Sequence, residues 1–141
     1  MTIEMHQKQY ILKMLKKYNL TGAKSVSTPA NPNVELCKDD EVSKPIDPVL
    51  YQSMVGSLLY VAIVTRPDIS QAVGVVSKFN SCPTEAHFTA VKRVLRYLKG
   101  GLDVMLKYKK TEDDQLVGFS DADYAGVTQM ISTPQVGSYF S

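Results

Sequence analysis

Tryptophan is absent from this chain of 141 residues, and cysteine, histidine and long apolar runs are scarce. The two cysteines, Cys37 and Cys82, do not have the spacing of a metal motif, which favours two reduced thiols. The longest apolar run covers only residues 58–64, far short of the roughly 20 residues that span a bilayer. The first residues lack the pattern of a secretory signal. We therefore expect an intracellular protein, in the cytoplasm or the nucleus, with no membrane partner.

The motifs of several enzyme classes are also missing. His6 and His87 have no cysteine or acidic partner at ligand spacing, so we expect both at the surface or at helix ends. Gly100-Gly101 is not followed by a helix signature, which argues against a phosphate-binding loop. No serine stands in a nucleophile elbow with a partnered histidine, so nothing favours nucleophilic catalysis.

Charge is segregated along the chain, although the net charge is only +2. Residues 1–28 hold five lysines and one acidic residue, and residues 65–110 hold nine Lys or Arg and three acidic residues. Residues 29–64 carry −3 and residues 111–141 carry −5. Two basic blocks are typical of a surface that meets phosphates, so nucleic acid is the expected partner.

Apolar residues at three- and four-residue spacing predict four helices, over about 6–20, 48–64, 67–80 and 83–99. Gly22 is expected to end the first helix. The second helix contains no charged residue, so it should lie at the centre of the core, with Leu59 on its buried stripe. Residues 25–48 contain four prolines and no periodic pattern, which predicts a long exposed connection.

The segment between the second and third helices contains Thr65-Arg66-Pro67-Asp68. Thr65 and Asp68 are expected to cap the third helix, and Arg66 to pair with a carboxylate or a carbonyl. Two strands are expected further on, at about 103–108 and 116–124, joined as a β-hairpin. The expected fold class is therefore α+β and mainly α, with a helical bundle over 1–101 and a β-hairpin in 102–141.

Four cations within eight residues make the fourth helix the best candidate for nucleic-acid contact: Lys92, Arg93, Arg96 and Lys99. Their spacing places Lys92, Arg96 and Lys99 on one face, where they could meet successive phosphates. The alternative is a solvated face, but such faces usually carry acidic residues as well, and Glu85 is the only one here. Three lysines of the first helix are weaker candidates, because a solvated face explains them equally well: Lys13, Lys16 and Lys17.

Two carboxylates, Asp121 and Asp123, lie in the last predicted strand. Side chains alternate along a strand, so these two should point to the same side. Paired carboxylates can bind a divalent metal. By spacing alone, however, two such residues are more often exposed to solvent.

Taken together, six stretches of this sequence resemble the Pol polyprotein of copia-type LTR retrotransposons, in order and in spacing. They are Gln9-Tyr10-Ile11, Val26-Ser27-Thr28-Pro29, residues 51–60 (YQSMVGSLLY), residues 65–69 (TRPDI), residues 90–100 (AVKRVLRYLKG) and residues 120–126 (SDADYAG). The resemblance covers nearly the whole chain, from the region after the reverse transcriptase palm to the start of the ribonuclease H domain.

The resemblance implies that residues 1–101 are a thumb-like region that grips a primer–template or RNA–DNA duplex. It also implies that residues 102–141 are a truncated, ribonuclease H-like start. Asp121 would then be the first carboxylate of a two-metal Mg²⁺ site, with a weaker claim for Asp123. The parent family is an RNA-directed DNA polymerase with ribonuclease H activity, and the remainder of Pol is an expected partner.

The chain also departs from the family. The Tyr-Val-Asp-Asp turn of the polymerase is absent, and residues 127–141 only faintly echo the family's Ser-Thr-Ser-Gly-Tyr segment. We therefore expect a fragment that binds nucleic acid at most, has no complete active site and uses no functional Mg²⁺. The alternatives are a decayed or host-reused helical module that binds protein, and an untranslated relic.

Overall fold

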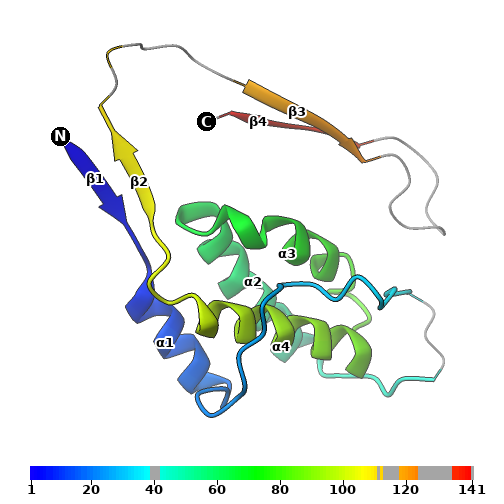
Figure 1. The fold of residues 1–141 in the computed structure, drawn as a ribbon. Coiled ribbons are helices and arrows are strands. Elements are labelled where there is room, and N and C mark those ends of the chain that lie inside the picture. The colour runs from blue at the N-terminus through cyan, green and yellow to red at the C-terminus, as the bar shows by residue number, and fades with distance from the viewer. Residues whose placement is uncertain (39–41, 111, 113–117, 124–134, 141) are drawn as a thin grey trace. The chain divides into compact units, whose positions relative to one another are not determined.

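The computed structural model describes residues 1–38, 42–110, 112, 118–123 and 135–140 (Figure 1). In chain order the elements are β1 (Thr2–Met5), α1 (Lys8–Lys17), α2 (Pro48–Val64), the 3-10 helix η1 (Pro67–Ile69), α3 (Ser70–Ser77), α4 (Glu85–Gly100), β2 (Leu106–Lys109), β3 (Gly118–Asp123) and β4 (Gln135–Phe140). These elements confirm a mainly helical α+β class. In the described ranges, no helix has both the length and the apolar character needed to cross a membrane.

The chain divides into two compact units. One comprises residues Thr2–Tyr108 and contains all the helices, and the other comprises Met1 with Lys109–Ser141. The helices follow the sequence prediction closely, and α2 has the predicted bounds. The predicted third helix consists of η1 followed directly by α3.

Local signals set the helix ends. The Asp47 carboxylate caps α2 by accepting a hydrogen bond from the Val49 amide at 3.0 Å, and Pro48 occupies the first helical position. Asn19 ends α1 with a left-handed φ of 56°, and the Leu20 amide donates to the Leu15 carbonyl at 2.8 Å. This is a Schellman ending, in which asparagine tolerates the left-handed conformation. The predicted stop at Gly22 is therefore wrong.

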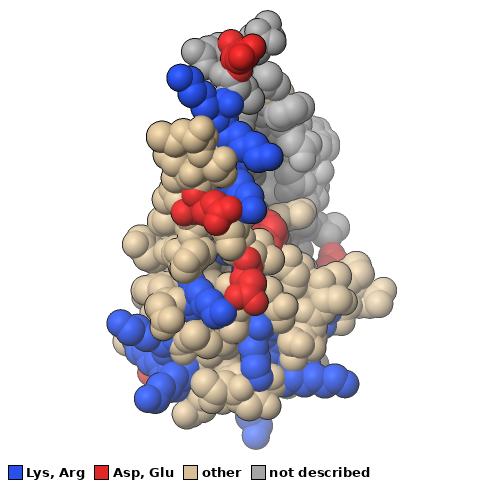
Figure 2. Space-filling view, turned by 60° about the vertical axis from the view of Figure 1, so that its left-hand side comes forward, with Lys and Arg blue, Asp and Glu red and all other residues tan. Residues whose placement is uncertain are grey.

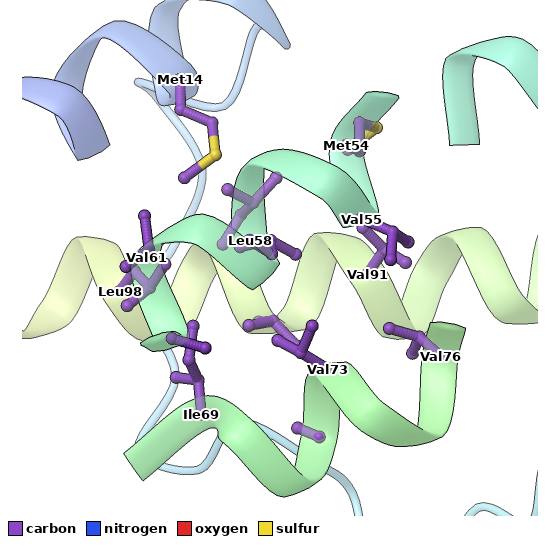
Figure 3. Packing of buried hydrophobic residues seen from close by; sticks show 14 of the residues in the cluster. Met14, Met54, Val55, Leu58, Val61, Ile69, Val73, Val76, Val91 and Leu98 are labelled. Carbon is purple, nitrogen blue, oxygen red and sulfur yellow. The ribbon is translucent and has the colours of Figure 1, made fainter. Parts of the chain in front are cut away.

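The core of the helical unit is formed by apolar side chains of every helix (Figure 3). Figure 3 shows Leu58 and Val61 of α2, Ile69 and Val73 of η1 and α3, and Leu98 of α4 pointing into a common interior. Each side chain buried in this way stabilises the fold by roughly 1.5–3 kcal/mol. The prediction that the third helix is buried through five residues is confirmed: Ile69, Ala72, Val73, Val76 and Phe79.

Helix α2 is central to this core, but only on one side. Its buried stripe contains Leu58, whereas Leu59 retains 37% of its exposure, so the predicted burial of Leu59 is wrong. Since α2 carries no charge, its other side is an exposed and largely apolar surface: Val49 is 75% exposed, Tyr60 53% and Ile63 80%. The absence of charge therefore does not mean that all sides of a helix are buried, because one side of α2 faces solvent.

The strands pair differently from the predicted hairpin. Strand β2 pairs with the N-terminal strand β1, and Lys107 bonds to Glu4 at 2.9 Å across the pair. Strand β3 pairs antiparallel with β4, from Gly118 opposite Phe140 to Asp123 opposite Gln135. The predicted pairing of 103–108 with 116–124 is therefore wrong. Turn residues between two strands favour a local hairpin, but the long-range pairing with β1 provides β2 with a partner instead.

Candidate nucleic-acid interface

Helix α4 begins with a mutual cap between Thr84 and His87. The Thr84 amide donates to Nδ1 of His87 at 3.0 Å. In return, the Thr84 side chain accepts a hydrogen bond from the backbone amide of His87. His87 takes the position that Glu or Gln holds in the usual capping box. The periodicity of α4 then buries one face of the helix, through Val91, Val94, Leu95 and Leu98.

His87 lies at a helix end, which is one of the two locations predicted for it, and it is not at the surface. The side chain is fully buried and stacks on Phe79, with ring centroids 3.9 Å apart. Since Nδ1 accepts from the Thr84 amide, Nε2 carries the proton and donates to the Cys37 carbonyl at 2.8 Å. The sequence Thr-x-x-His before an apolar run was the signal for this cap.

The cations of α4 hold the connection between α1 and α2. We call residues 21–37 the strap. Lys99 donates from Nζ to the carbonyls of Thr21 and Ala23, both at 2.6 Å, and Arg96 donates from Nε to the Lys24 carbonyl at 2.7 Å. The predicted long connection has no helix or strand in residues 25–38 and 42–47, but it is fastened to α4.

Two further cations complete the predicted set on α4. Arg93 donates from a terminal guanidinium nitrogen to the Thr28 hydroxyl at 2.8 Å, while its Nε is buried without an acceptor in the described part of the chain. The ammonium of Lys92 lies 4.3 Å from the centroid of the Phe88 ring, a cation–π contact. All four predicted residues are half-buried. The structure brings them together on one side of α4, where Arg93, Arg96 and Lys99 contact the strap and Lys92 contacts Phe88.

Sequence reasoning could not detect that these cations bind the strap. Most of the acceptors are main-chain carbonyls, and every residue supplies one. The strap carries no periodic pattern that would indicate which carbonyls approach α4. Gly100 is the only local hint, because a Cβ there would lie 3.2 Å from the Cβ of Ser25. Its position close to the strap requires a small residue.

A second polar cluster fixes the junction of α2, η1 and α4. The Arg66 guanidinium binds both carboxylate oxygens of Asp68, at 3.0 and 2.9 Å, and donates to the Gly101 carbonyl at 2.6 Å. The Tyr97 hydroxyl donates to the same carboxylate at 2.7 Å. The predicted pairing of Arg66 with a carboxylate or a carbonyl is confirmed, and both kinds of partner are present.

The predicted cap by Thr65 is wrong, whereas Asp68 lies in the first turn of η1, at the positive end of the predicted third helix, as expected. Thr65 ends α2 instead, and its hydroxyl donates to the Gln7 side chain at 2.7 Å. Asp68 lies within η1, and its carboxylate is used by Arg66. Burial alone would lower the pKa of Arg66 and raise that of Asp68, but their mutual hydrogen bonds and charges outweigh it. The pKa of Arg66 is therefore raised and the pKa of Asp68 lowered.

The lysines of α1 have a different environment from those of α4. Lys13, Lys16 and Lys17 are exposed, as is Lys24 in the strap. Residues 5–34 contain no Asp or Glu, and neither do residues 86–102. Because α1 packs against α4 and the strap lies on α4, these two acid-free segments form one cationic side of the helical unit. Figure 2 shows several Lys and Arg side chains at the lower end, the level of α1 in Figure 1, and others at the upper end.

Asp121 and Asp123 lie in β3, two positions apart in the strand. Their side chains lie outside the described part of the structure, so their predicted metal-binding role stays a prediction. In the β3–β4 register the residues opposite them are Gly137 and Gln135, neither of which is acidic. In the rest of the described chain, no three His, Cys, Asp or Glu side chains form a group suited to a metal ion.

The described helical unit is therefore a small, mainly helical domain with a cationic side. Its sequence is 44% identical over 124 residues to a retrovirus-related Pol polyprotein from transposon RE1 of Arabidopsis thaliana, covering 88% of this chain and 8% of the relative. It is 42% identical over 125 residues to the corresponding polyprotein from transposon TNT 1-94 of Nicotiana tabacum, covering 85% of this chain and 9% of the relative. The chain thus belongs to the copia-type retrotransposon Pol polyproteins, as a segment of that sequence.

The similarity covers most of this chain but only a small part of each relative. The chain spans under a tenth of the length of these two Pol polyproteins. It also matches half of an uncharacterised mitochondrial protein of Arabidopsis thaliana, at 37% identity over 122 residues. No family model matches the chain, and no solved structure matches it.

Proposed function

We propose that this chain is a nucleic-acid-binding segment of Pol, which contacts RNA–DNA duplexes through its cationic side. One observation carries the proposal: two acid-free segments, residues 5–34 and 86–102, fold against each other. They concentrate nine Lys or Arg residues, of which Lys8 forms an ion pair with Asp103. Such a surface attracts phosphates and releases counterions when it binds them.

The resemblance to the reverse transcriptase thumb supports the choice of ligand. By the resemblance, a thumb-like region grips the primer–template duplex, and cationic side chains would meet its phosphates. Such contacts carry little sequence information, so binding should depend on the form of the duplex more than on its sequence. The similarity to two Pol polyproteins supports a Pol origin, and the duplex as ligand is our proposal.

Fluorescence anisotropy with a labelled RNA–DNA hybrid of 20 base pairs tests the proposal. With about four phosphate contacts, affinity should fall roughly 100-fold between 50 and 200 mM salt. A scrambled hybrid of the same length should bind equally well. An affinity that does not change with salt, or no binding at 50 mM salt, would contradict the proposal.

We further propose that the 141-residue chain catalyses neither polymerisation nor RNA cleavage, and that it uses no Mg²⁺. By the resemblance, Asp121 is one carboxylate of a two-metal site in a ribonuclease H-like fold, and such a site takes ligands from several elements. The strand paired with β3 places Gly137 opposite Asp121 and adds no carboxylate there. Incubation of the chain with a labelled hybrid and Mg²⁺ tests this, and RNA cleavage that is lost in Asp121→Asn would refute it.

The exposed apolar side of α2 favours a second candidate function, the binding of protein. Val49, Tyr60 and Ile63 are each more than half exposed on one uncharged helix. Apolar surface of this kind commonly marks an interaction site. The remainder of a Pol polyprotein is the partner that the resemblance implies. Salt-independent binding to the remainder of a Pol polyprotein that is abolished by Ile63→Glu, together with no affinity for duplexes, would favour this function over the first.

A further inference from the structure

The cations of α4 and those of α1 differ in how freely they could bind a phosphate. The ammonium of Lys99 already donates to two carbonyls at 2.6 Å, and Arg96 donates to a third at 2.7 Å. A phosphate that took these donors would leave main-chain carbonyls of the strap without partners. The bonds to Thr21 and Lys24 are exposed and the bond to Ala23 is part-buried, so the main cost is that the strap would lose its attachment to α4. The α4 cations are therefore poorly placed to be the principal phosphate contacts.

Four lysines of α1 and the strap donate no side-chain hydrogen bond to the described chain, unlike Lys8, which pairs with Asp103 at 2.7 Å. Lys13, Lys16, Lys17 and Lys24 are exposed. Long cationic side chains of this kind keep the ammonium group in water, so they can turn to a phosphate at little cost. Lys16 and Lys17 also complement the negative end of the α1 dipole, which is a purely structural reason for their presence. Lys24 lies beyond the helix, so that reason does not cover it.

We propose that Lys13, Lys16, Lys17 and Lys24 contact the phosphates, whereas Arg96 and Lys99 are positioning residues that hold the strap. This inference rests on the proposed function and locates its contacts. Arg96 binds the carbonyl of Lys24 itself, so it fixes the backbone from which the Lys24 side chain extends. Lys99 binds Thr21 and Ala23, directly before Lys24.

The assignment differs from the sequence prediction in a measurable way. Each phosphate contact that is lost should reduce the slope of log affinity against log salt by about 1. The triple variant Lys16→Gln, Lys17→Gln, Lys24→Gln should therefore lose about 3 from that slope. Its urea midpoint should fall only slightly, because these side chains are exposed and only the interaction of Lys16 and Lys17 with the α1 dipole is lost. The matched control is Lys38→Gln, an exposed lysine outside the cationic side, which should keep the full slope.

A coupling measurement tests the positioning role. Lys99→Met should lower the urea midpoint and loosen the strap. In that background the further change Lys24→Gln should alter the salt slope by much less than it does in the unmodified chain. Lys99→Arg, which can still donate to both carbonyls, should restore the effect of Lys24→Gln. If Lys99 only stabilises the fold, Lys24→Gln should change the salt slope equally in the unmodified, Lys99→Met and Lys99→Arg chains. That result would overturn the positioning role.

The outcomes separate this inference from the proposed function. If the unmodified chain shows no salt-dependent affinity for the hybrid, the proposed function fails. If it does show this affinity and the triple variant keeps the full slope, the proposed function stands and the present assignment is wrong. If Arg96→Gln reduces the salt slope without changing the urea midpoint, and the triple variant keeps the full slope, the phosphate contacts lie on α4 instead.

Discussion

Arg66 and Asp68 form a two-point ion pair in which one partner is almost completely buried and the other is not. The side chain of Arg66 retains 2% of its exposure and that of Asp68 retains 35%, and their closest atoms are 2.9 Å apart. The Arg66 charge is compensated by Asp68, by the Gly101 carbonyl and by the face of Tyr97. This cluster joins the end of α2 to the end of α4, so it holds the frame on which the strap lies.

Removal of the carboxylate should destabilise the helical unit. Asp68→Ala leaves a buried guanidinium without its counterion, and we expect the free energy of unfolding to fall by about 3 kcal/mol. This is the low end for breaking a buried ion pair, because water reaches Asp68. Urea denaturation followed by circular dichroism measures the loss. Asp103→Asn, which breaks an exposed ion pair with Lys8, is the control and should leave the midpoint unchanged.

The same pair predicts how stability depends on pH. Since the pKa of Asp68 is lowered in the folded state, its stabilising contribution is present above the unfolded pKa of about 4 and is lost as the pH falls through the folded value. The urea midpoint should therefore decrease from pH 5 to pH 2.5. Asp68→Asn should be less stable at pH 7 and show a flatter acid limb. Parallel acid limbs for the two proteins would contradict the linkage.

The buried His87 should control the attachment of the strap. His87→Ala removes the cap at Thr84, the bond to Cys37 and the stacking on Phe79, and should cost about 2 kcal/mol or more. Limited proteolysis should then cut the strap faster. His87→Gln is the matched variant, because glutamine at this position can still form a capping box. If both variants resist proteolysis as the unmodified chain does, the strap is not held through His87.

Two glycines should respond in opposite directions to substitution. A Cβ at Gly101 would lie 3.2 Å from the Arg66 guanidinium and 3.4 Å from a Val104 methyl, so Gly101→Val should lower thermal stability. A Cβ at Gly56 would meet nothing within 4 Å, and Gly56 lies inside α2. Gly56→Ala should therefore stabilise the chain, by up to about 1 kcal/mol. Melting temperatures that fall for both variants would show that the α2 surface is not open.

The sequence predicted the helices well because their signals are local. Pro48 and Asp47 define the start of α2, and the spacing of Ile69, Val73 and Val76 defines the buried face of α3. The long-range contacts were not predictable in this way. Strand β2 pairs with β1, which is about a hundred residues away in the sequence. The residues of a turn carry no information about a pairing between such distant segments.

The candidate site was predicted only in part, for a related reason. The clustering of Lys92, Arg93, Arg96 and Lys99 follows from helical spacing, and the structure places them on one side of α4. Their bonds to the strap depend on the path of the main chain, which no side-chain pattern reveals. The exposed lysines differ from the α4 cations that bind the strap in their exposure to solvent. Exposure depends on the folded structure, so the sequence alone did not reveal the difference.

The most direct test of the cationic side as the duplex-binding surface is an NMR titration of the ¹⁵N-labelled chain with the RNA–DNA hybrid. We expect the largest amide shift changes in residues 13–28, which carry the exposed lysines of α1 and the strap, with smaller changes along α4. The apolar side of α2 should remain unaffected. Shift changes confined to α2, or spread evenly over the helical unit, would contradict the account.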